Sequence, residues 1–131
     1  MSVYRTRSFS RWARKQRLSD AVLCHAVHEM QQGLYEADLG GGLLKKRVAR
    51  AGQGKSGGFR TIVATNRGDR WFFVHGFAKN EQSNIDDVEE AALKKLAKTL
   101  LTLSPASLAK AESMGEIIEV KCDSEETLKD S

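Results

Sequence analysis

A chain of 131 residues, 40% of them hydrophobic, can bury one core but is too short for two ordinary domains, so we expect a single domain over 1–131. No run reaches the ~18 apolar residues of a membrane span, and the N-terminus lacks the apolar stretch of a signal peptide, which favours a cytoplasmic protein without a membrane partner. The net charge of +4 is divided into +10 over residues 1–79 and −6 over residues 80–131, and the basic part favours a nucleic-acid partner.

The first part of the chain predicts one strand and two helices. Val3 to Thr6 form a short strand, after which Ser8 can cap a helix with a buried apolar stripe. A second helix begins at Ser19 and ends at Gly33. We expect a glycine-rich link over 38–42 to lead the chain out of this helical region.

Three extended segments follow the link. They cover Leu43 to Ala49, Phe59 to Asn66 and Trp71 to Phe77, and the last is rich in aromatic and β-branched residues. A turn at 67–69 joins the second segment to the third. This pattern predicts an antiparallel meander of three strands.

The acidic part of the chain predicts a long amphipathic helix with charged residues opposite its apolar side. Its apolar stripe is expected at Val88, Ala92, Leu96, Leu100 and Leu103, and the opposite charged face at Glu90, Lys94 and Lys98.

A short second helix and a last strand complete the prediction. Ser104 and Pro105 begin the helix, Gly115 ends it, and 116–121 can form the strand. Residues 123–131 form a polar tail that is expected to be flexible and acidic. The predicted fold class is α+β, with helices packed on one side of a small, mostly antiparallel sheet and charge on the other.

Two glycine motifs in the middle of the chain favour a plain loop over a nucleotide site. Residues 49–56 fit a loose phosphate-loop pattern, and Gly52, Gly54 and Gly57 have dinucleotide-binding spacing. Both motifs work only when a helix opens directly after the loop, whereas here a strand pattern follows at Phe59.

Histidine and cysteine usage predicts neither a metal ion nor a cofactor. His25 and His28 could offer two ligands from one helical face, but no third ligand accompanies them. Cys24 and Cys122 lie far apart in sequence, and we expect both to be free thiols because a cytosol keeps them reduced.

The residues that carry chemistry are the cations of the meander. Adjacent strands lie ~4.8 Å apart, so side chains on one face of neighbouring strands can converge on one phosphate. If Arg60 faces that site, alternation places Ile62 beside it and sends Phe59, Thr61 and Val63 to the other face. The basic set is Lys45, Lys46, Arg47, Arg50, Lys55, Arg60, Arg67, Arg70, His75 and Lys79.

Such a cluster suits the cleavage of RNA, because the 2′-hydroxyl of RNA is itself the nucleophile. The protein has to remove its proton, stabilise the phosphorane and protonate the leaving 5′-oxygen. Arginine holds two phosphate oxygens with its planar fork. Clustered lysines with lowered pKa values, or a histidine such as His75, can move the protons.

Three segments together resemble the core of the RelE-like toxins. They are Leu44-Lys45-Lys46-Arg47, the loop ending Lys55-Ser56-Gly57-Gly58-Phe59-Arg60, and the stretch from Phe72 to Asn80. The similarity extends from Tyr4 to Val120.

This resemblance implies a RelE-like α+β ribonuclease that is the toxin of a type II toxin–antitoxin system. Such a protein cuts mRNA, often on the ribosome, and is silenced by a cognate antitoxin. No tyrosine follows Tyr35, so the catalytic tyrosine of some relatives has no counterpart. The expected catalytic residues are Arg60, Lys79, Lys55, Lys46 and His75, and the expected RNA-binding residues are Lys45, Arg47, Arg50 and Arg70.

Other functions stay open at this point. The cluster could bind RNA or an acidic partner without cutting, or the fold could carry a gyrase-poisoning toxin, because fold does not fix function. A DNA-binding module is less favoured, since no helix-turn-helix with a basic second helix is present.

Overall fold

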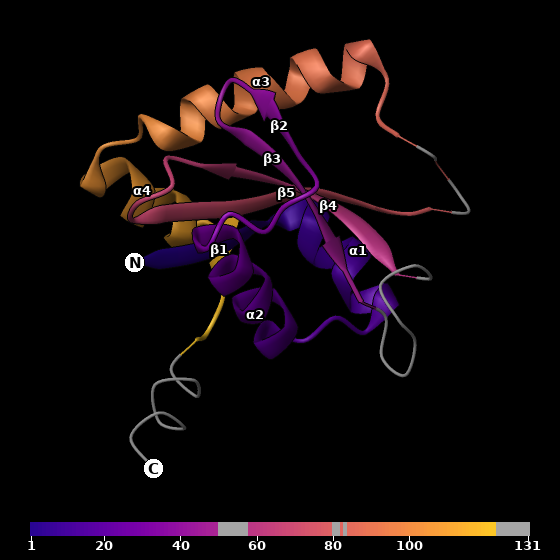
Figure 1. The fold of residues 1–131 in the computed structure, drawn as a ribbon. Coiled ribbons are helices and arrows are strands. Elements are labelled where there is room, and N and C mark those ends of the chain that lie inside the picture. Colours follow the sequence, from indigo (N-terminus) through magenta and orange to yellow (C-terminus); the bar gives the residue numbers. More distant parts are fainter. Residues whose placement is uncertain (50–57, 80–81, 83, 123–131) are drawn as a thin grey trace.

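A computed structural model describes residues 1–49, 58–79, 82 and 84–122, in which two pairs of helices separate the strands into three groups along the chain (Figure 1). Within these residues, six strands form one sheet in the order β2-β3-β4-β5-β1-β6. They are β1 (Ser2–Thr6), β2 (Ala37–Gly40), β3 (Leu43–Val48), β4 (Phe59–Thr65), β5 (Arg70–Ala78) and β6 (Ile117–Glu119). Every neighbouring pair is antiparallel except β1 and β5, which confirms the mostly antiparallel sheet and the meander β3-β4-β5.

In the part of the chain that the structure describes, four helices accompany the sheet: α1 (Arg7–Gln16), α2 (Asp20–Gln31), α3 (Asp87–Leu101) and α4 (Pro105–Ser113). The predicted caps at Ser19 and Ser104 are confirmed, because each side chain accepts a backbone N–H of the following turn. The cap predicted at Ser8 is wrong. Thr6 takes that place and accepts from the N–H of Phe9, because the chain passes from β1 directly into α1.

The glycine-rich link forms more structure than the sequence predicts. Residues 37–40 are a strand that pairs with β3, so β2 and β3 make a hairpin at the edge of the sheet. Gly40, Gly41 and Gly42 all have positive φ, which a tight connection between two strands demands. The glycines are therefore the turn of a hairpin.

Helices cover both faces of the sheet, which corrects the prediction of one-sided packing. Alternate side chains of each strand point to opposite faces, and each face has its own apolar core. Val3, Leu44 and Phe73 pack with α1 and α2, whereas their neighbours in sequence pack with α3. In Figure 1, α3 lies above the sheet and α1 and α2 lie below it. The α+β class itself is confirmed.

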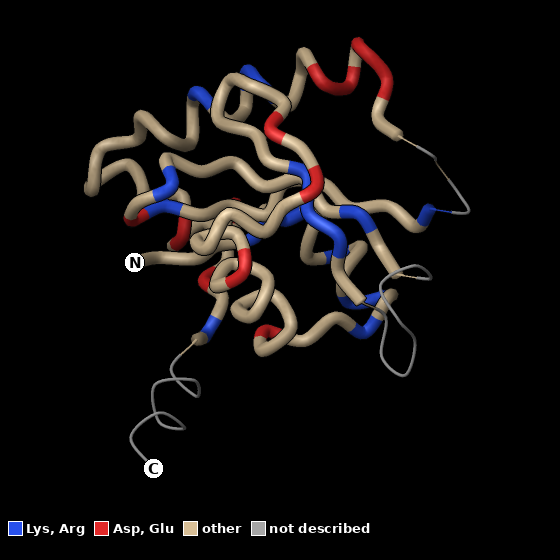
Figure 2. Tube along the Cα trace, viewed as in Figure 1, with Lys and Arg blue, Asp and Glu red and all other residues tan. Residues whose placement is uncertain are grey.

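The long helix buries a different stripe from the predicted one. Leu93, Ala97 and Leu100 are its buried residues, while Val88 is 81% exposed. The buried face shares Leu100 with the predicted stripe and is otherwise turned by about one residue. The stem of Lys94 packs over the β2-β3 turn, where a Cβ on Gly41 would lie 3.0 Å from its Cγ. The charge asymmetry appears in the fold, since Figure 2 shows acidic residues gathered where α3 begins.

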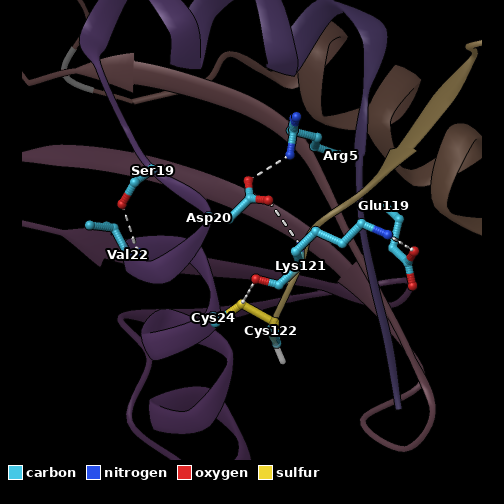
Figure 3. A network of polar contacts seen from close by, with 8 residues as sticks. All are labelled: Arg5, Ser19, Asp20, Val22, Cys24, Glu119, Lys121 and Cys122. Atoms are coloured by element: carbon cyan, nitrogen blue, oxygen red, sulfur yellow. Dashed lines mark hydrogen bonds and ion pairs between the residues drawn. A yellow bond between two sulfur atoms is a disulfide. The ribbon is translucent and has the colours of Figure 1, made fainter. Parts of the chain in front are cut away.

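The two cysteines form a disulfide, so the prediction of free thiols is wrong (Figure 3). Strand β6 pairs with β1, and the chain then passes α2, which brings Cys122 to Cys24 across a separation of 98 residues. The backbone N–H of Lys121 donates to Asp20 of α2 at 2.9 Å, and the other oxygen of Asp20 accepts from Arg5 at 2.8 Å. The end of the sheet is therefore fastened to α2 by polar contacts as well as by sulfur.

Two regions singled out in the sequence lie outside the described residues: the glycine motifs, apart from Ala49, and the tail 123–131. Among the helices that the structure describes, none combines the length and apolar character needed to cross a membrane.

Candidate functional site

The strand register gathers three cations of the meander on the sheet face that α3 covers. Arg47 and Arg60 are direct partners across β3 and β4, and Lys45 pairs with Ile62 on the same face. Ile62 lies in the core beneath α3, whereas Phe59 contacts Trp12 of α1 on the other face. The predicted orientation of Arg60 relative to its strand neighbours is thus confirmed. We call Lys45, Arg47 and Arg60 the cationic cluster.

The cationic cluster surrounds a carboxylate that the sequence reasoning missed. Glu36, just before β2, has one oxygen 3.0 Å from Nε of Arg60 and 3.8 Å from Nζ of Lys45. Its other oxygen lies 3.9 Å from Nε of Arg47. The β2-β3 hairpin brings Glu36 there, because its backbone N–H donates to the carbonyl of Lys45 at 2.8 Å. Recognising residue 37 as the start of a strand would have found it.

Two guanidinium nitrogens of the cationic cluster are buried and donate no hydrogen bond to a described residue. Nη1 of Arg60 and Nε of Arg47 have no hydrogen-bond partner among the described residues, and the Arg60 side chain is only 7% exposed. A buried donor without a partner costs about 1–3 kcal/mol. An anion that accepted these donors would remove that cost, so the cluster is suited to a group with several oxygens, such as a phosphate.

His75 lies beside the cationic cluster, on the face of the sheet that α3 covers. A register shift in β5 opposite Ile62 places His75 toward α3, where its Nε2 lies 3.5 Å from Glu89. Glu89 also accepts from Gln82 at 2.9 Å. Arg60 pairs with Phe77, two residues from His75, so the arginine and the histidine are diagonal neighbours about 7 Å apart. The imidazole of His75 and the carboxylate of Glu89 therefore lie on the same face of the sheet as the cationic cluster.

Lys46 does not join the cluster, which corrects its predicted place in the site. It points to the α2 face, where Nζ binds Glu29 at 2.8 Å and the carbonyl of Leu34 at 2.9 Å. The alternation of β3 separates it from Lys45 and Arg47 on either side.

Arg70 is also separated from the cluster, at the opposite end of β5. Its guanidinium donates to the carbonyl of Leu100 at the end of α3. Arg70 and Phe77 are seven residue steps apart along the extended strand, about 23 Å. Arg70 therefore joins α3 to the sheet.

Of the remaining predicted residues, Lys79 follows β5 directly and is exposed, at the end of the sheet that holds the cluster. Arg50 and Lys55 lie outside the described residues. Gly58, directly before Phe59, is required by close packing, because a Cβ there would clash with the backbone carbonyl of Val48.

The paired histidines of α2 gain no third ligand in the structure. Among the described residues, no three His, Cys, Asp or Glu side chains lie close enough to hold a metal ion. His25 is largely exposed and lies 3.6 Å from Glu29, an ordinary pairing along a helix.

Comparison with known families gives a match that covers most of the chain. The model of the family described as the RelE toxin of the RelE/RelB toxin–antitoxin system matches residues 1–120. No curated protein matches the chain. The match spans all six strands and four helices, and therefore the whole frame that positions the cationic cluster. The chain belongs to the RelE toxin family, and so to the toxins of toxin–antitoxin systems.

Proposed function

We propose that this toxin is a metal-independent endonuclease that cuts mRNA and uses the 2′-hydroxyl of the RNA as nucleophile. The observation that supports this most is the cationic cluster, in which two buried guanidinium nitrogens have no hydrogen-bond partner among the described residues. A scissile phosphate gains negative charge as it becomes a phosphorane, and preorganised donors bind that state better than the starting phosphate. Arg60, with its fork, is the main donor in this proposal, and Lys45 and Arg47 support it.

Proton transfer in the proposed reaction is assigned to His75. Glu89, 3.5 Å from its Nε2, restricts the orientation of the ring. The same imidazole can accept the proton of the 2′-hydroxyl or donate one to the leaving 5′-oxygen. Lys79, exposed directly after β5, completes the proposed set as a further cation near the phosphate, and Lys55, which lies outside the described residues, stays a predicted member of the set.

Glu36 has a different proposed role, as the anion that holds the cationic cluster together in the free protein. Three like charges at the ends of neighbouring strands repel one another, and a carboxylate among them offsets this repulsion. An entering phosphate takes over the contacts of Glu36 with the cluster.

The chemistry can be tested with two versions of one RNA. Purified toxin is incubated with an RNA that it cleaves and with the same strand carrying a single 2′-deoxynucleotide before the cut, both in the presence of a chelator. We expect a 2′,3′-cyclic phosphate and a 5′-hydroxyl from the first strand and no cut at that position in the second. Equal cleavage of both strands would exclude the 2′-hydroxyl as nucleophile.

The dependence on the ribosome is measured in the same way. The RNA is supplied either free or as the message of purified translating ribosomes, and cleavage positions are mapped in each reaction. If the folded protein cleaves the RNA in neither reaction, the proposed function is contradicted.

A further inference from the structure

The outer face of α1 is basic throughout. Apart from Ser8, every exposed side chain of this helix is a cation, and the helix has no acidic residue. Positions 7, 11, 14 and 15 fall on one side of a helix, opposite the buried Phe9 and Ala13. Arg17 follows at the C-cap and is exposed too. The exposed cations beyond the first turn are Arg11, Arg14, Lys15 and Arg17, which we call the α1 basic face.

These cations are not engaged in holding the fold together. None of the four has an ion-pair partner among the residues that the structure describes, whereas Arg7 donates to the carbonyls of Met114 and Gly115. Cations in a last helical turn stabilise the helix dipole by about 0.3–1 kcal/mol each. The helix dipole can explain the positions of Arg14 and Lys15 in the last turn, but not that of Arg11, which lies about one turn earlier.

The helix leads from the middle of the sheet to the end that holds the cationic cluster. Phe9 packs on Phe73 with ring centroids 5.3 Å apart, and Trp12 packs edge-on against Phe59 at 5.3 Å. Gly76 provides the space for the Trp12 ring, since a Cβ there would overlap it. The later turns of α1 therefore lie at the end where β4 begins and β5 finishes. Figure 2 shows Lys and Arg positions on the strands and on α1 toward this end.

We propose that the α1 basic face is a second RNA-binding surface, which holds the phosphate backbone of the strand beyond the cleavage site. This inference rests on the proposed function, because it takes RNA as the ligand of the cationic cluster. The two surfaces lie on opposite faces of the sheet at one end, so a strand that passes around this end can contact both. The face contacts phosphates and adds affinity without reading sequence.

The composition of the face favours RNA over an acidic protein segment. Protein interfaces depend on apolar and aromatic anchors at their centre, and the α1 basic face has no exposed apolar side chain. A nucleic-acid backbone presents phosphates, for which charge and guanidinium donors are sufficient. Arg11 alone also borders an apolar groove between α1 and the helices α3 and α4, where a protein segment could bind.

Binding to 2′-O-methyl RNA tests the inference without cleavage. A short strand of about six nucleotides, near the low end of footprints of small single-strand-binding domains, reaches the cationic cluster alone, and a strand several times longer reaches both surfaces. The test variant carries Arg11→Gln, Arg14→Gln and Lys15→Gln, which keep a good helix former at each position. The matched control carries Lys95→Gln, Lys98→Gln and Lys110→Gln, an equal loss of charge from exposed positions of α3 and α4.

We expect the test variant to weaken binding of the long strand only. Its log-log salt slope should fall by about 2, since each phosphate contact on a single strand contributes ~0.7. The control variant should bind both strands as the parent does. Circular dichroism and thermal melting of each variant establish that α1 is intact.

Three results would overturn the inference. The first is an unchanged salt slope in the test variant. The second is an equal loss of RNA affinity in the control variant, and the third is an equal loss of affinity for the short and the long strand in the test variant. An unchanged slope together with weaker binding of an acidic protein partner would assign the face to protein instead. Arg60→Ala, measured alongside, should weaken the binding of both the short and the long strand. If it weakens the binding of neither, the proposed phosphate site is wrong, while the result for the α1 basic face still stands.

Discussion

Neighbouring lysines on one strand have opposite surroundings in this toxin. On the α2 face of the sheet, Lys46 is buried and binds Glu29 at 2.8 Å, close to a disulfide-fastened helix. On the α3 face, Lys45 lies 3.8 Å from Glu36, and the neighbouring arginines have buried nitrogens without hydrogen-bond partners among the described residues. One face satisfies its charges within the protein, and the other keeps donors for a ligand.

The difference shows how one basic run in a sequence can serve two purposes. Because strand side chains alternate, a run of cations is divided between a face that stabilises and a face that binds. Changes on the α2 face should therefore lower the free energy of unfolding and leave cleavage intact. Changes to the cationic cluster on the α3 face should reduce cleavage and leave the free energy of unfolding largely unchanged.

Replacement of Arg60 by alanine should have the largest effect on activity. We expect cleavage to fall by about two to three orders of magnitude, as loss of a transition-state donor usually causes. Arg60→Lys should recover only part of the rate, because lysine restores the charge but not the fork. Single-turnover cleavage of saturating RNA measures the effect on the chemical step.

Thermal melting is the control for this variant, because Arg60 is buried. If Arg60→Ala unfolds the domain, its role is structural, and the comparison between the two faces fails. A folded Arg60→Ala protein that cleaves at the parental rate would remove Arg60 from the site.

Loss of the disulfide should give the largest change in stability. A crosslink between residues 98 apart restricts the unfolded chain strongly, and we expect Cys122→Ala to lower the free energy of unfolding by about 2–4 kcal/mol. Urea denaturation with and without a thiol reductant measures this. The reductant should destabilise the parent by a similar amount and leave the variant unchanged, and cleavage should stay the same in both.

The matched pair Lys46→Ala and Lys45→Ala tests the comparison most directly. Removing one partner of a buried ion pair costs about 3 kcal/mol, so Lys46→Ala should be strongly destabilising. Lys45→Ala should cost less than about 1 kcal/mol in stability, since its neighbouring carboxylate is 3.8 Å away, but it should weaken RNA binding. Equal destabilisation by the two variants would show that the faces do not differ as argued.

The fold could be predicted from the sequence where local signals act alone. Ser19, Ser104 and Gly115 mark helix ends through capping, which depends on a few neighbouring residues. The meander followed from its extended segments, the last rich in aromatic and β-branched residues, and from the turn at 67–69. Packing on both faces did not follow, because the strands are apolar on both sides and the sequence pattern does not show which helix covers each side.

The site could be predicted only where a local rule sets the orientation of a side chain. Arg60 and its strand neighbours were correctly oriented, because alternation is a local rule. Glu36 was missed, since its closeness to Arg60 depends on the hairpin between β2 and β3. The pairing of Cys24 with Cys122 depends on β6 returning beside β1, a contact between the two ends of the chain.

The smallest predicted effect concerns Glu36 and sharpens the account of the α3 face. If this carboxylate only occupies the place of a phosphate among the cations, Glu36→Gln removes a competing anion and keeps a similar shape. Binding of uncleavable RNA should then tighten by about 1 kcal/mol, or roughly fivefold, the scale of one partly exposed ion pair. Fluorescence anisotropy with 2′-O-methyl RNA measures the affinity, and Glu112→Gln, an exposed acid on α4, is the charge control. Cleavage at saturating RNA should change little, because His75 carries the proton in our proposal. A loss of cleavage by two or more orders of magnitude at unchanged affinity would instead make Glu36 the general base, since that is the contribution such a group makes.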